Sequence, residues 1–294
     1  MRQCDAASRV LCTGRKSGLG VVLQKLIFAS VACIALLAAG AAMAADLSLP
    51  TRQAPIAAPA AAPNWSGFYI GGNFGAGRDQ NDATVTGAST DPALDPFLAF
   101  FLAAGAVPTS PSAAADGGFG GGQIGYNWQI DPHWVLGAET DFEWSRIKGS
   151  DSQTPTPLGF DLATWSVSKK LDWFGTVRAR AGFLVDPSVM FYATGGYAYG
   201  RTTMSYSTAD ITNGCLANAF ICGAASSSGI SNGWTAGGGV EAMLTQHLTM
   251  KAEYLYVDLG GRTVNDPTNT PLVFSASSQF HEQTVRVGLN YLFN

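Results

Sequence analysis

Hydrophobic and polar residues alternate along most of this chain with a period of two. Between residues 124 and 130 the even positions are Ile, Tyr, Trp and Ile, whereas the odd positions are Gly, Asn and Gln. Residues 136–144 alternate in the same way, with Glu and Asp on the polar face. This is the repeat of a β-strand, whose successive side chains point to opposite faces. The pattern predicts eight strands, at about residues 65–78, 118–130, 134–147, 169–183, 189–202, 231–244, 248–260 and 279–293.

The links between these strands alternate between short and long. Residues 130–134, 185–189 and 244–248 are tight turns, and the first two contain Asp-Pro, which favours a turn. The long links are residues 79–117, 148–168, 203–230 and 261–278. A soluble sandwich also has alternating strands, but short links on one side and long links on the other are typical of outer-membrane barrels. The sequence therefore predicts an all-β fold, an eight-stranded antiparallel transmembrane up-and-down β-barrel.

Physical chemistry requires such a sheet to close on itself. In hydrocarbon no water satisfies the backbone N–H and C=O groups of an edge strand. Aromatic residues near the predicted strand ends fit the interfacial girdles of a membrane barrel, although ordinary core aromatics are the alternative. They are Trp65, Phe68, Trp128, Trp134, Trp144, Trp173, Tyr199, Trp234, Tyr291 and Phe293.

Composition supports the membrane interpretation. Only 13% of the residues are charged and 47% are hydrophobic, whereas a soluble domain usually carries about 25% charged residues. Much of the surface is therefore expected to face something other than water. After residue 44 no apolar run reaches the roughly 20 residues that a membrane helix needs, so the chain is expected to cross with strands.

Residues 1–44 have the features of a signal peptide for export. Lys25 precedes the apolar run 26–37, and residues 42–44 (AMA) have the small-x-small pattern of a cleavage site. A permanent anchor helix is the alternative, which the small residues after the run disfavour. A start codon near Val21 or Val22 would shorten the segment before Lys25 to an ordinary length. Residues 45–63, rich in Pro and Ala, are predicted to form an extended periplasmic tether, and the barrel is predicted to occupy residues 64–294.

Cleavage after Ala44 changes the charge and the cysteine content. It would remove five of 17 basic and one of 21 acidic residues, which leaves 12 and 20 and a net charge of about −8. An acidic protein lacks the basic face that nucleic acid needs, so no nucleic-acid partner is expected. Only Cys215 and Cys222 remain, and an even pair in an exported protein predicts one disulfide.

Seven segments, in this order, resemble those of one known family. They are residues 65–73 (WSGFYIGGN), 122–128 (GQIGYNW), 137–142 (GAETDF), 175–182 (GTVRARAG), 195–200 (GGYAYG), 234–241 (WTAGGGVE) and 251–258 (KAEYLYVD). Together they resemble the alphaproteobacterial outer-membrane immunogenic proteins, porin-like barrels akin to the transmembrane domain of OmpA.

The resemblance implies an abundant surface antigen of the bacterial cell outer membrane that contributes to envelope integrity. The expected partners are outer-membrane lipid, lipopolysaccharide and the barrel-assembly machinery, and no external ligand is implied. Chains of this kind usually end on an aromatic residue that the assembly machinery reads. Here Asn294 follows Phe293, so the signal is shifted by one residue.

Charged residues recur on the polar face of the predicted strands and are expected to point into the barrel. They are Glu139, Asp141, Glu143, Arg178, Arg180, Glu241, Lys251, Glu253 and Arg286. One interpretation is a network of ion pairs that fills the lumen, and the other is a charged constriction that lines a pore. Eight strands leave an interior that side chains fill, which favours the network.

Other candidate sites are weak. His281 and Glu282 lie near Ser275, Ser277 and Ser278, which makes a hydrolytic group conceivable, but no spacing fixes a triad. The glycine clusters precede no helix and are not expected to bind phosphate. The sequence thus predicts no catalytic residues, no cofactor and no metal site.

Three classes of function follow from the sequence. The first is a structural outer-membrane barrel with a lumen closed by its own charges, the second a narrow, weakly conducting porin, and the third a ligand-binding or adhesion protein that works through its loops. The apolar segment 94–107 in the first long link either packs across the barrel mouth or forms a contact patch.

Overall fold

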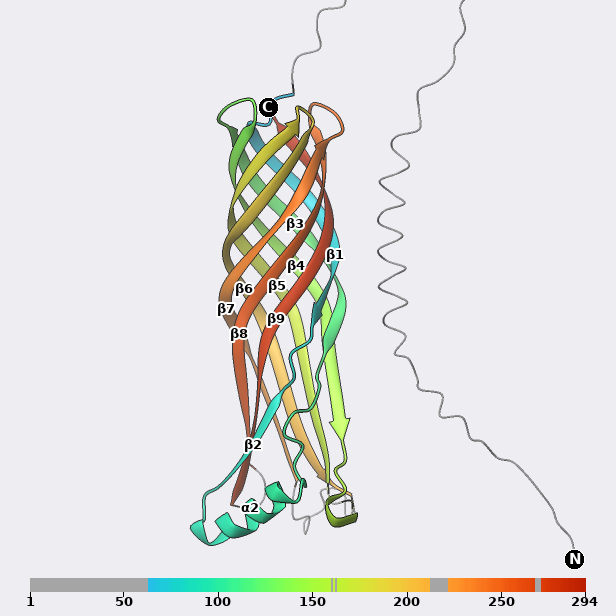
Figure 1. Cartoon of the computed structure of the whole chain (residues 1–294), viewed down its shortest axis with the longest axis vertical. Coiled ribbons are helices and arrows are strands. Elements are labelled where there is room, and N and C mark those ends of the chain that lie inside the picture. The colour runs from blue at the N-terminus through green and yellow to red at the C-terminus, as the bar shows by residue number, and fades with distance from the viewer. Residues whose placement is uncertain (1–62, 160, 162, 212–221, 268–270) are drawn as a thin grey trace, which may run out of the picture. The chain divides into compact units, whose positions relative to one another are not determined.

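The computed structural model describes residues 63–159, 161, 163–211, 222–267 and 271–294. Eight long antiparallel strands form a closed ring, because the first and the last of them also pair with each other (Figure 1). The predicted fold class is therefore confirmed. The eight strands are β1 (Gly67–Asp79), β3 (Ala115–Gln129), β4 (Trp134–Gln153), β5 (Ala163–Asp186), β6 (Val189–Asp210), β7 (Gly223–Met243), β8 (Leu248–Pro267) and β9 (Leu272–Phe293).

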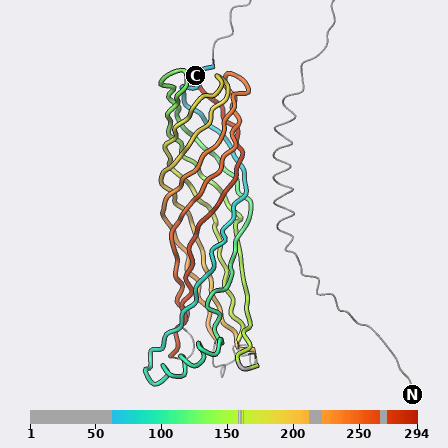
Figure 2. The backbone as a smooth tube through the Cα atoms, viewed as in Figure 1, coloured from blue at the N-terminus to red at the C-terminus, as the bar shows by residue number. Residues whose placement is uncertain are grey.

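The register of the strands sets the shape of the barrel. Following cross-strand partners from Phe68 on β1 around the ring leads back to β1 at Arg78, ten residues further along. A closed eight-stranded sheet with such a stagger has strands tilted by about 35–45° and an interior just wide enough for side chains. The tilt is visible in the backbone trace of Figure 2.

The predicted tight turns form as expected, and Asp begins two of them. The Asp131 carboxylate accepts hydrogen bonds from the backbone N–H groups of His133 and Trp134, at 2.7 and 2.8 Å. Asp186 accepts from the backbone N–H and the hydroxyl of Ser188, at 2.9 and 2.6 Å. These two hydrogen bonds lower the pKa of the exposed Asp186 carboxyl.

The strands are longer at their external ends than predicted. β4 and β6 continue to Gln153 and Asp210, and β5 and β7 begin at Ala163 and Gly223. The alternation continues there with small hydroxyl residues outside and apolar residues such as Trp165 inside, so the sheet extends into segments that composition alone suggested were loops.

The first long link folds over the external end of the barrel. Its short strand β2 (Thr84–Ser89) pairs with β9 beyond the end of β1, and a 3₁₀ turn η1 (Pro92–Leu94) and a helix α2 (Asp95–Ala103) follow. The Asp91 side chain caps η1 by accepting a hydrogen bond from the Ala93 N–H at 3.0 Å. Leu98 of α2 is buried, so this segment packs across the mouth of the barrel, while Phe100 remains exposed. Among the described residues, no helix has the length and apolar character needed to cross a membrane.

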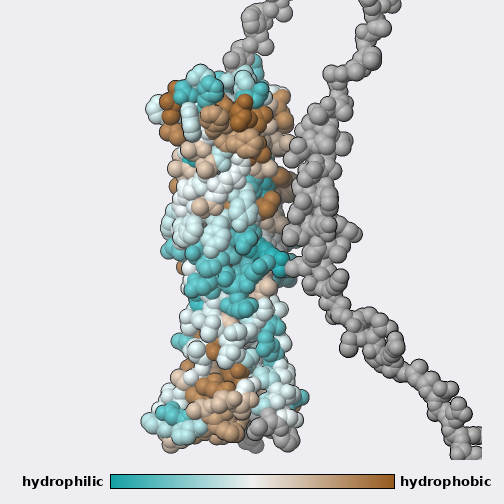
Figure 3. Space-filling view, in the orientation of Figure 1, coloured by the Kyte–Doolittle hydropathy of each residue, from teal (hydrophilic) through white to brown (hydrophobic). Residues whose placement is uncertain are grey.

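The outward face carries most of the predicted aromatic girdle. Phe68, Trp128, Trp144, Trp234 and Phe293 are exposed on it. On the face seen in Figure 3, apolar residues gather near the end with the short turns and again at the opposite end, and a polar band crosses the middle.

Trp65 was expected in the girdle, and that expectation is wrong. It is 0% exposed and packs against Val135, Leu184 and Met190 inside the periplasmic end. The odd positions at the start of β1, such as Tyr69 and Asn73, point inward, and Trp65 follows the same alternation. The predicted signal peptide and nearly all of the predicted tether lie outside the described residues, so those two predictions stand as predictions.

Candidate functional site

The barrel interior contains the candidate site. All nine charged residues expected on the polar face point inward and are buried. Three strand registers bring opposite charges to the same height: Glu139 faces Arg178, Glu241 faces Lys251, and Glu253 faces Arg286. The alternation of the strands therefore selects which charges enter the lumen. Of the three facing pairs, the first and the third are in contact, whereas Glu241 pairs with Arg180 and Lys251 with Glu139.

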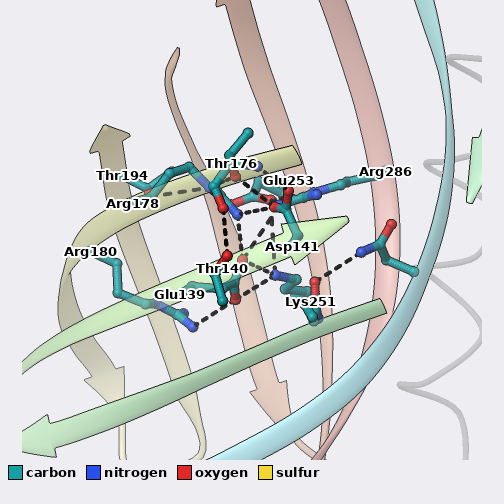
Figure 4. A network of polar contacts seen from close by, with 12 residues as sticks. Glu139, Thr140, Asp141, Thr176, Arg178, Arg180, Thr194, Lys251, Glu253 and Arg286 are labelled. Atoms are coloured by element: carbon teal, nitrogen blue, oxygen red, sulfur yellow. Dashed lines mark hydrogen bonds and ion pairs between the residues drawn. The ribbon is translucent and has the colours of Figure 1, made fainter. Parts of the chain in front are cut away.

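Arg178 lies at the centre of the network (Figure 4). Its guanidinium hydrogen-bonds to Glu139, to Asp141 at 3.0 Å and to Glu253 at 2.8 Å. Asp141 also accepts from the hydroxyl of Thr176 at 2.8 Å. One cation thus joins carboxylates from β4 and β8, on different sides of the ring.

Arg286 binds the same group of carboxylates from β9. Its Nη2 lies 2.9 Å from Asp141 and its Nη1 lies 3.0 Å from Glu143. Its Nε donates to Glu253 at 2.6 Å. Lys251 donates to both carboxylate oxygens of Glu139 at 2.8 Å. The contacts of these cations cross the lumen, so they link the strands of the ring directly.

A second part of the network lies nearer the short turns. Arg180 pairs with Glu241 at 2.5 Å, and Glu241 also accepts from the Thr249 hydroxyl at 2.6 Å. The Arg180 guanidinium lies 4.1 Å from the centre of the Tyr192 ring. The Tyr69 hydroxyl donates to Glu139 at 2.7 Å and accepts from Arg180 at 3.2 Å, so it connects the two parts.

Close packing around Tyr69 requires a glycine. Gly125 on β3 lies beneath the Tyr69 ring, and a Cβ at this position would come within 2.4 Å of the ring. Gly125 is also the registered partner of Glu139, the carboxylate that Tyr69 binds. The missing side chain therefore leaves room for the tyrosine that joins the network.

Three buried amides in the same layer lie outside the predicted set of charged residues. The Asn73 side chain donates to Gln123 at 3.0 Å, and Gln123 donates to Asn290 at 2.5 Å. Asn290 in turn donates to Glu241 at 2.9 Å. The parity that identified the charged residues also places these amides inside, so a search that included neutral polar residues would have found them.

A separate buried ion pair lies towards the external end and was also missed. Lys169 of β5 binds Asp79 of β1 at 2.6 Å, and Glu282 is buried nearby. The register of β5 against β6 shifts between Leu171 and Trp173, and this bulge reverses which positions point inward. Parity counted from Arg178 therefore places Lys169 on the wrong face.

Apolar side chains fill the external half of the lumen. The ring centres of Trp165 and Phe274 lie 4.9 Å apart, and those of Phe119 and Phe174 lie 5.3 Å apart. Leu98 of α2 belongs to the same cluster. A space of only about 10 Å³ remains between α2 and the barrel wall.

The residues of the conceivable hydrolytic group do not come together. His281 lies on the outward face, where its Nε2 is 3.5 Å from Asp258, whereas Glu282 and Ser278 are buried inside. Ser275 and Ser277 lie on the outward face of β9, on the opposite side from Ser278. Adjacent residues of a strand point to opposite faces, which accounts for this separation.

The predicted disulfide is untested because Cys215 lies outside the described residues. Cys222 is buried and disulfide-bonded. Its pairing with Cys215 therefore stays a prediction.

Comparisons with known proteins agree with this architecture. A family model described as the outer membrane protein beta-barrel domain matches residues 30–293. The 31 kDa outer-membrane immunogenic protein of Brucella melitensis biotype 1 is 38% identical over 274 residues, which is 92% of this chain and 100% of that protein. The 22 kDa outer membrane protein of Rhizobium leguminosarum bv. viciae is 30% identical over 175 residues, 59% of this chain and 66% of that protein.

A solved structure is also similar. The outer membrane protein OprG from Pseudomonas aeruginosa aligns over 78% of this chain and 97% of its own, with 13% identity and a TM-score of 0.38. The family model and the Brucella relative both extend over most of the chain, and they confirm the predicted family and location. This chain belongs to the alphaproteobacterial outer-membrane immunogenic protein family and is a β-barrel protein of the bacterial outer membrane.

Proposed function

We propose that this protein is a structural component of the outer membrane whose lumen is closed by its own side chains. It contributes to envelope integrity and presents its external loops at the cell surface, and it neither catalyses a reaction nor serves as a general pore. The arrangement of the barrel interior supports this proposal.

The observation that carries the proposal is the filling of the lumen in two successive layers. In the membrane-spanning part, Arg178 and Arg286 connect carboxylates across the interior. Beyond it, the cluster around Trp165 and Phe274 and the helix α2 fill the external part. An ion would have to displace both a paired charge network and an apolar core, and an unpaired charge in such a place is costly.

Assembly into the membrane would use the barrel-assembly machinery that the family resemblance implies. Phe293, the last residue of β9, lies exposed on the outward face. The Asn294 side chain donates to the Asn64 carbonyl at 2.8 Å, next to the start of β1. We therefore expect the machinery to read Phe293, the exposed aromatic residue at the end of the last strand.

Planar-bilayer recording of the refolded mature protein tests the closed lumen. A shift between unheated and boiled samples on a gel first establishes that the barrel has folded. We expect no steady conductance from the wild-type protein. A small but steady conductance would overturn the closed lumen and favour the narrow porin instead.

Sensitivity to detergent tests the role in the envelope. Cells that lack the protein should become more sensitive, and the wild-type gene should restore resistance. A variant in which Arg178 is replaced by Ala should restore it less well, in proportion to its reduced amount of folded barrel. Unchanged sensitivity of the cells that lack the protein would contradict the envelope role.

A further inference from the structure

The outward-facing cations among the described residues lie on only four of the eight long strands, β1, β4, β5 and β6. Eleven Lys and Arg residues belong to the described part of the chain, and six of them point into the barrel. The five that point outward are Arg78, Arg146, Lys148, Lys170 and Arg201. None of the five lies on the outward face of β7, β8 or β9.

Four of these cations form a compact group on three neighbouring strands, which we call the cationic patch: Arg146, Lys148, Lys170 and Arg201. Lys148 of β4 and Lys170 of β5 are direct cross-strand partners. Arg146 lies two residues from Lys148 on the same face, and Arg201 of β6 is the partner of Trp173 on β5. Like charges placed directly opposite each other destabilise a sheet, so this arrangement calls for an anion.

Carboxylates neutralise the cationic patch only in part. Lys170 pairs with Asp172 at 2.5 Å, and Asp116 of β3 faces Lys148 in register. Within the part of the chain that the structure describes, Arg146, Lys148 and Arg201 form no ion pair within 4.0 Å. Four cations therefore face two acidic groups, and a net positive charge remains.

Aromatic rings fix the level of the cationic patch relative to the membrane. Trp144, 68% exposed, comes two residues before Arg146 on β4. Trp173 and Tyr199 lie beside it, with their ring centres 6.1 Å apart. Tryptophan and tyrosine rings gather at the boundary between hydrocarbon and headgroups. The cations lie just external to these rings and so at the level of the outer-leaflet headgroups.

Hydroxyl groups cover the same strands beyond the cations. The side chains of Ser152 and Ser166 lie 2.9 Å apart, and those of Ser205 and Ser226 lie 3.0 Å apart. They line an outward recess of about 330 Å³. Outward residues on β4, β5 and β6 thus change in the same order towards the outside, from aromatic to cationic to hydroxyl.

We propose that this face of β4–β6 binds a phosphorylated glycolipid of the outer leaflet. Its phosphate groups lie against the cationic patch, where Arg146 and Arg201 offer forked donors and Lys148 and Lys170 offer ammonium charges. Its sugar extends over the serine recess, which presents donors and acceptors but no charge. This site is independent of whether the lumen is closed.

The experiment uses the folded mature protein in detergent and measures lipid binding by native mass spectrometry. The probes are bisphosphorylated lipid A, its dephosphorylated form and phosphatidylglycerol. We expect wild-type protein to prefer the bisphosphorylated lipid A over both others. The triple variant Arg146→Gln, Lys148→Gln, Arg201→Gln should bind it on the order of 100-fold more weakly, since each interfacial cation contributes a similar increment.

Two controls locate the site. Arg78→Gln removes an outward cation on β1, outside the cationic patch, and should leave the preference unchanged. Ser152→Ala with Ser205→Ala should weaken binding of a lipid A that carries core sugars more than binding of lipid A alone. Each variant must show the heat-dependent gel shift of a folded barrel before it is compared.

Several results would overturn the proposal. Equal binding of phosphorylated and dephosphorylated lipid A would exclude phosphate recognition, and equal binding of phosphatidylglycerol would indicate a general anionic-lipid surface. If Arg78→Gln weakened binding of bisphosphorylated lipid A as much as Lys148→Gln alone, that result would contradict a localised patch. If the triple variant kept the wild-type preference for bisphosphorylated lipid A, that result would also contradict a localised patch.

Discussion

Glu139 on β4 and Arg178 on β5 are direct cross-strand partners, and their charged groups hydrogen-bond inside the barrel. The two do not have equivalent surroundings. Arg178 also binds Asp141 and Glu253, whereas Glu139 also accepts from Lys251. Removing Arg178 therefore takes a cation from three carboxylates, whereas removing Glu139 takes a carboxylate from Arg178 and Lys251.

Arg178→Ala should be the more destabilising of the two substitutions. It takes a cation away from three buried carboxylates, and breaking such a buried pair costs about 3–5 kcal/mol. Glu139→Ala should cost less, because Arg178 keeps Asp141 and Glu253, and Lys251, which loses its two hydrogen bonds to Glu139, still has Glu253 at 3.9 Å. Denaturation of the refolded barrel in detergent micelles, followed by its far-ultraviolet signal, measures both losses.

The double variant Arg178→Ala, Glu139→Ala should lose less stability than the sum of the single variants, because the two residues share one network. Arg201→Ala is a suitable control, since this arginine is exposed and outside the lumen. Strict additivity of the two losses would show that the pair is not coupled.

Gly125→Ala tests the packing that brings Tyr69 to Glu139. Its Cβ would lie 2.4 Å from the Tyr69 ring and 2.7 Å from the backbone oxygen of Ala138, so the ring must move. We expect a loss of about 1–3 kcal/mol, typical of overpacking. Gly72→Ala on β1 is the matched control, because its Cβ would come no nearer than 3.7 Å to Gly121. Equal stability of the two variants would contradict the close-packing argument.

Strand parity explains why so much of the lumen could be predicted from sequence. An uninterrupted strand gives each residue a face, so nine charges could be assigned to the interior from the alternation alone. Parity does not supply the partners. The contacts of Arg286 with Glu143 and Asp141 cross the lumen, and they depend on the stagger of the closed ring.

Bulges limit the same reasoning. The register shift beside Leu171 brings Lys169 inside, and the shift between Asp258 and Gly261 does the same for Arg262, whose guanidinium binds Thr202 at 2.9 Å. Gly260, at a φ of 72°, adopts a conformation at this second shift that favours glycine. In the sequence, only the glycine pair at 260–261 indicates that the inward and outward positions exchange at this point.

The pairing of Cys215 with Cys222 remains to be measured. The two residues enclose a short loop, so a disulfide between them should form readily in the oxidising periplasm. Peptide mapping of membrane-extracted protein, alkylated without reduction, should show a linked peptide and no labelled Cys222. Labelling of both thiols would rule the bond out.

Trp65→Ala should open the periplasmic end of the core. The indole is buried among Val135, Leu184 and Met190, and its N–H donates to the Pro187 carbonyl at 3.0 Å. Replacing such a side chain leaves a cavity and costs about 3–5 kcal/mol. The indole also ties the segment before β1 to the turn between β5 and β6, so its loss should expose that segment to protease.

Trp134→Ala provides the control for this prediction, since that indole is 48% exposed on the outward face. The Trp134→Ala variant should lose less stability, and the segment before β1 should stay protected from protease. Tryptophan fluorescence separates the two cases further. Because Trp65 is 0% exposed, an aqueous quencher should reach little of its emission in the folded barrel. If Trp65→Ala and Trp134→Ala unfold at the same denaturant concentration, Trp65 does not anchor the periplasmic end.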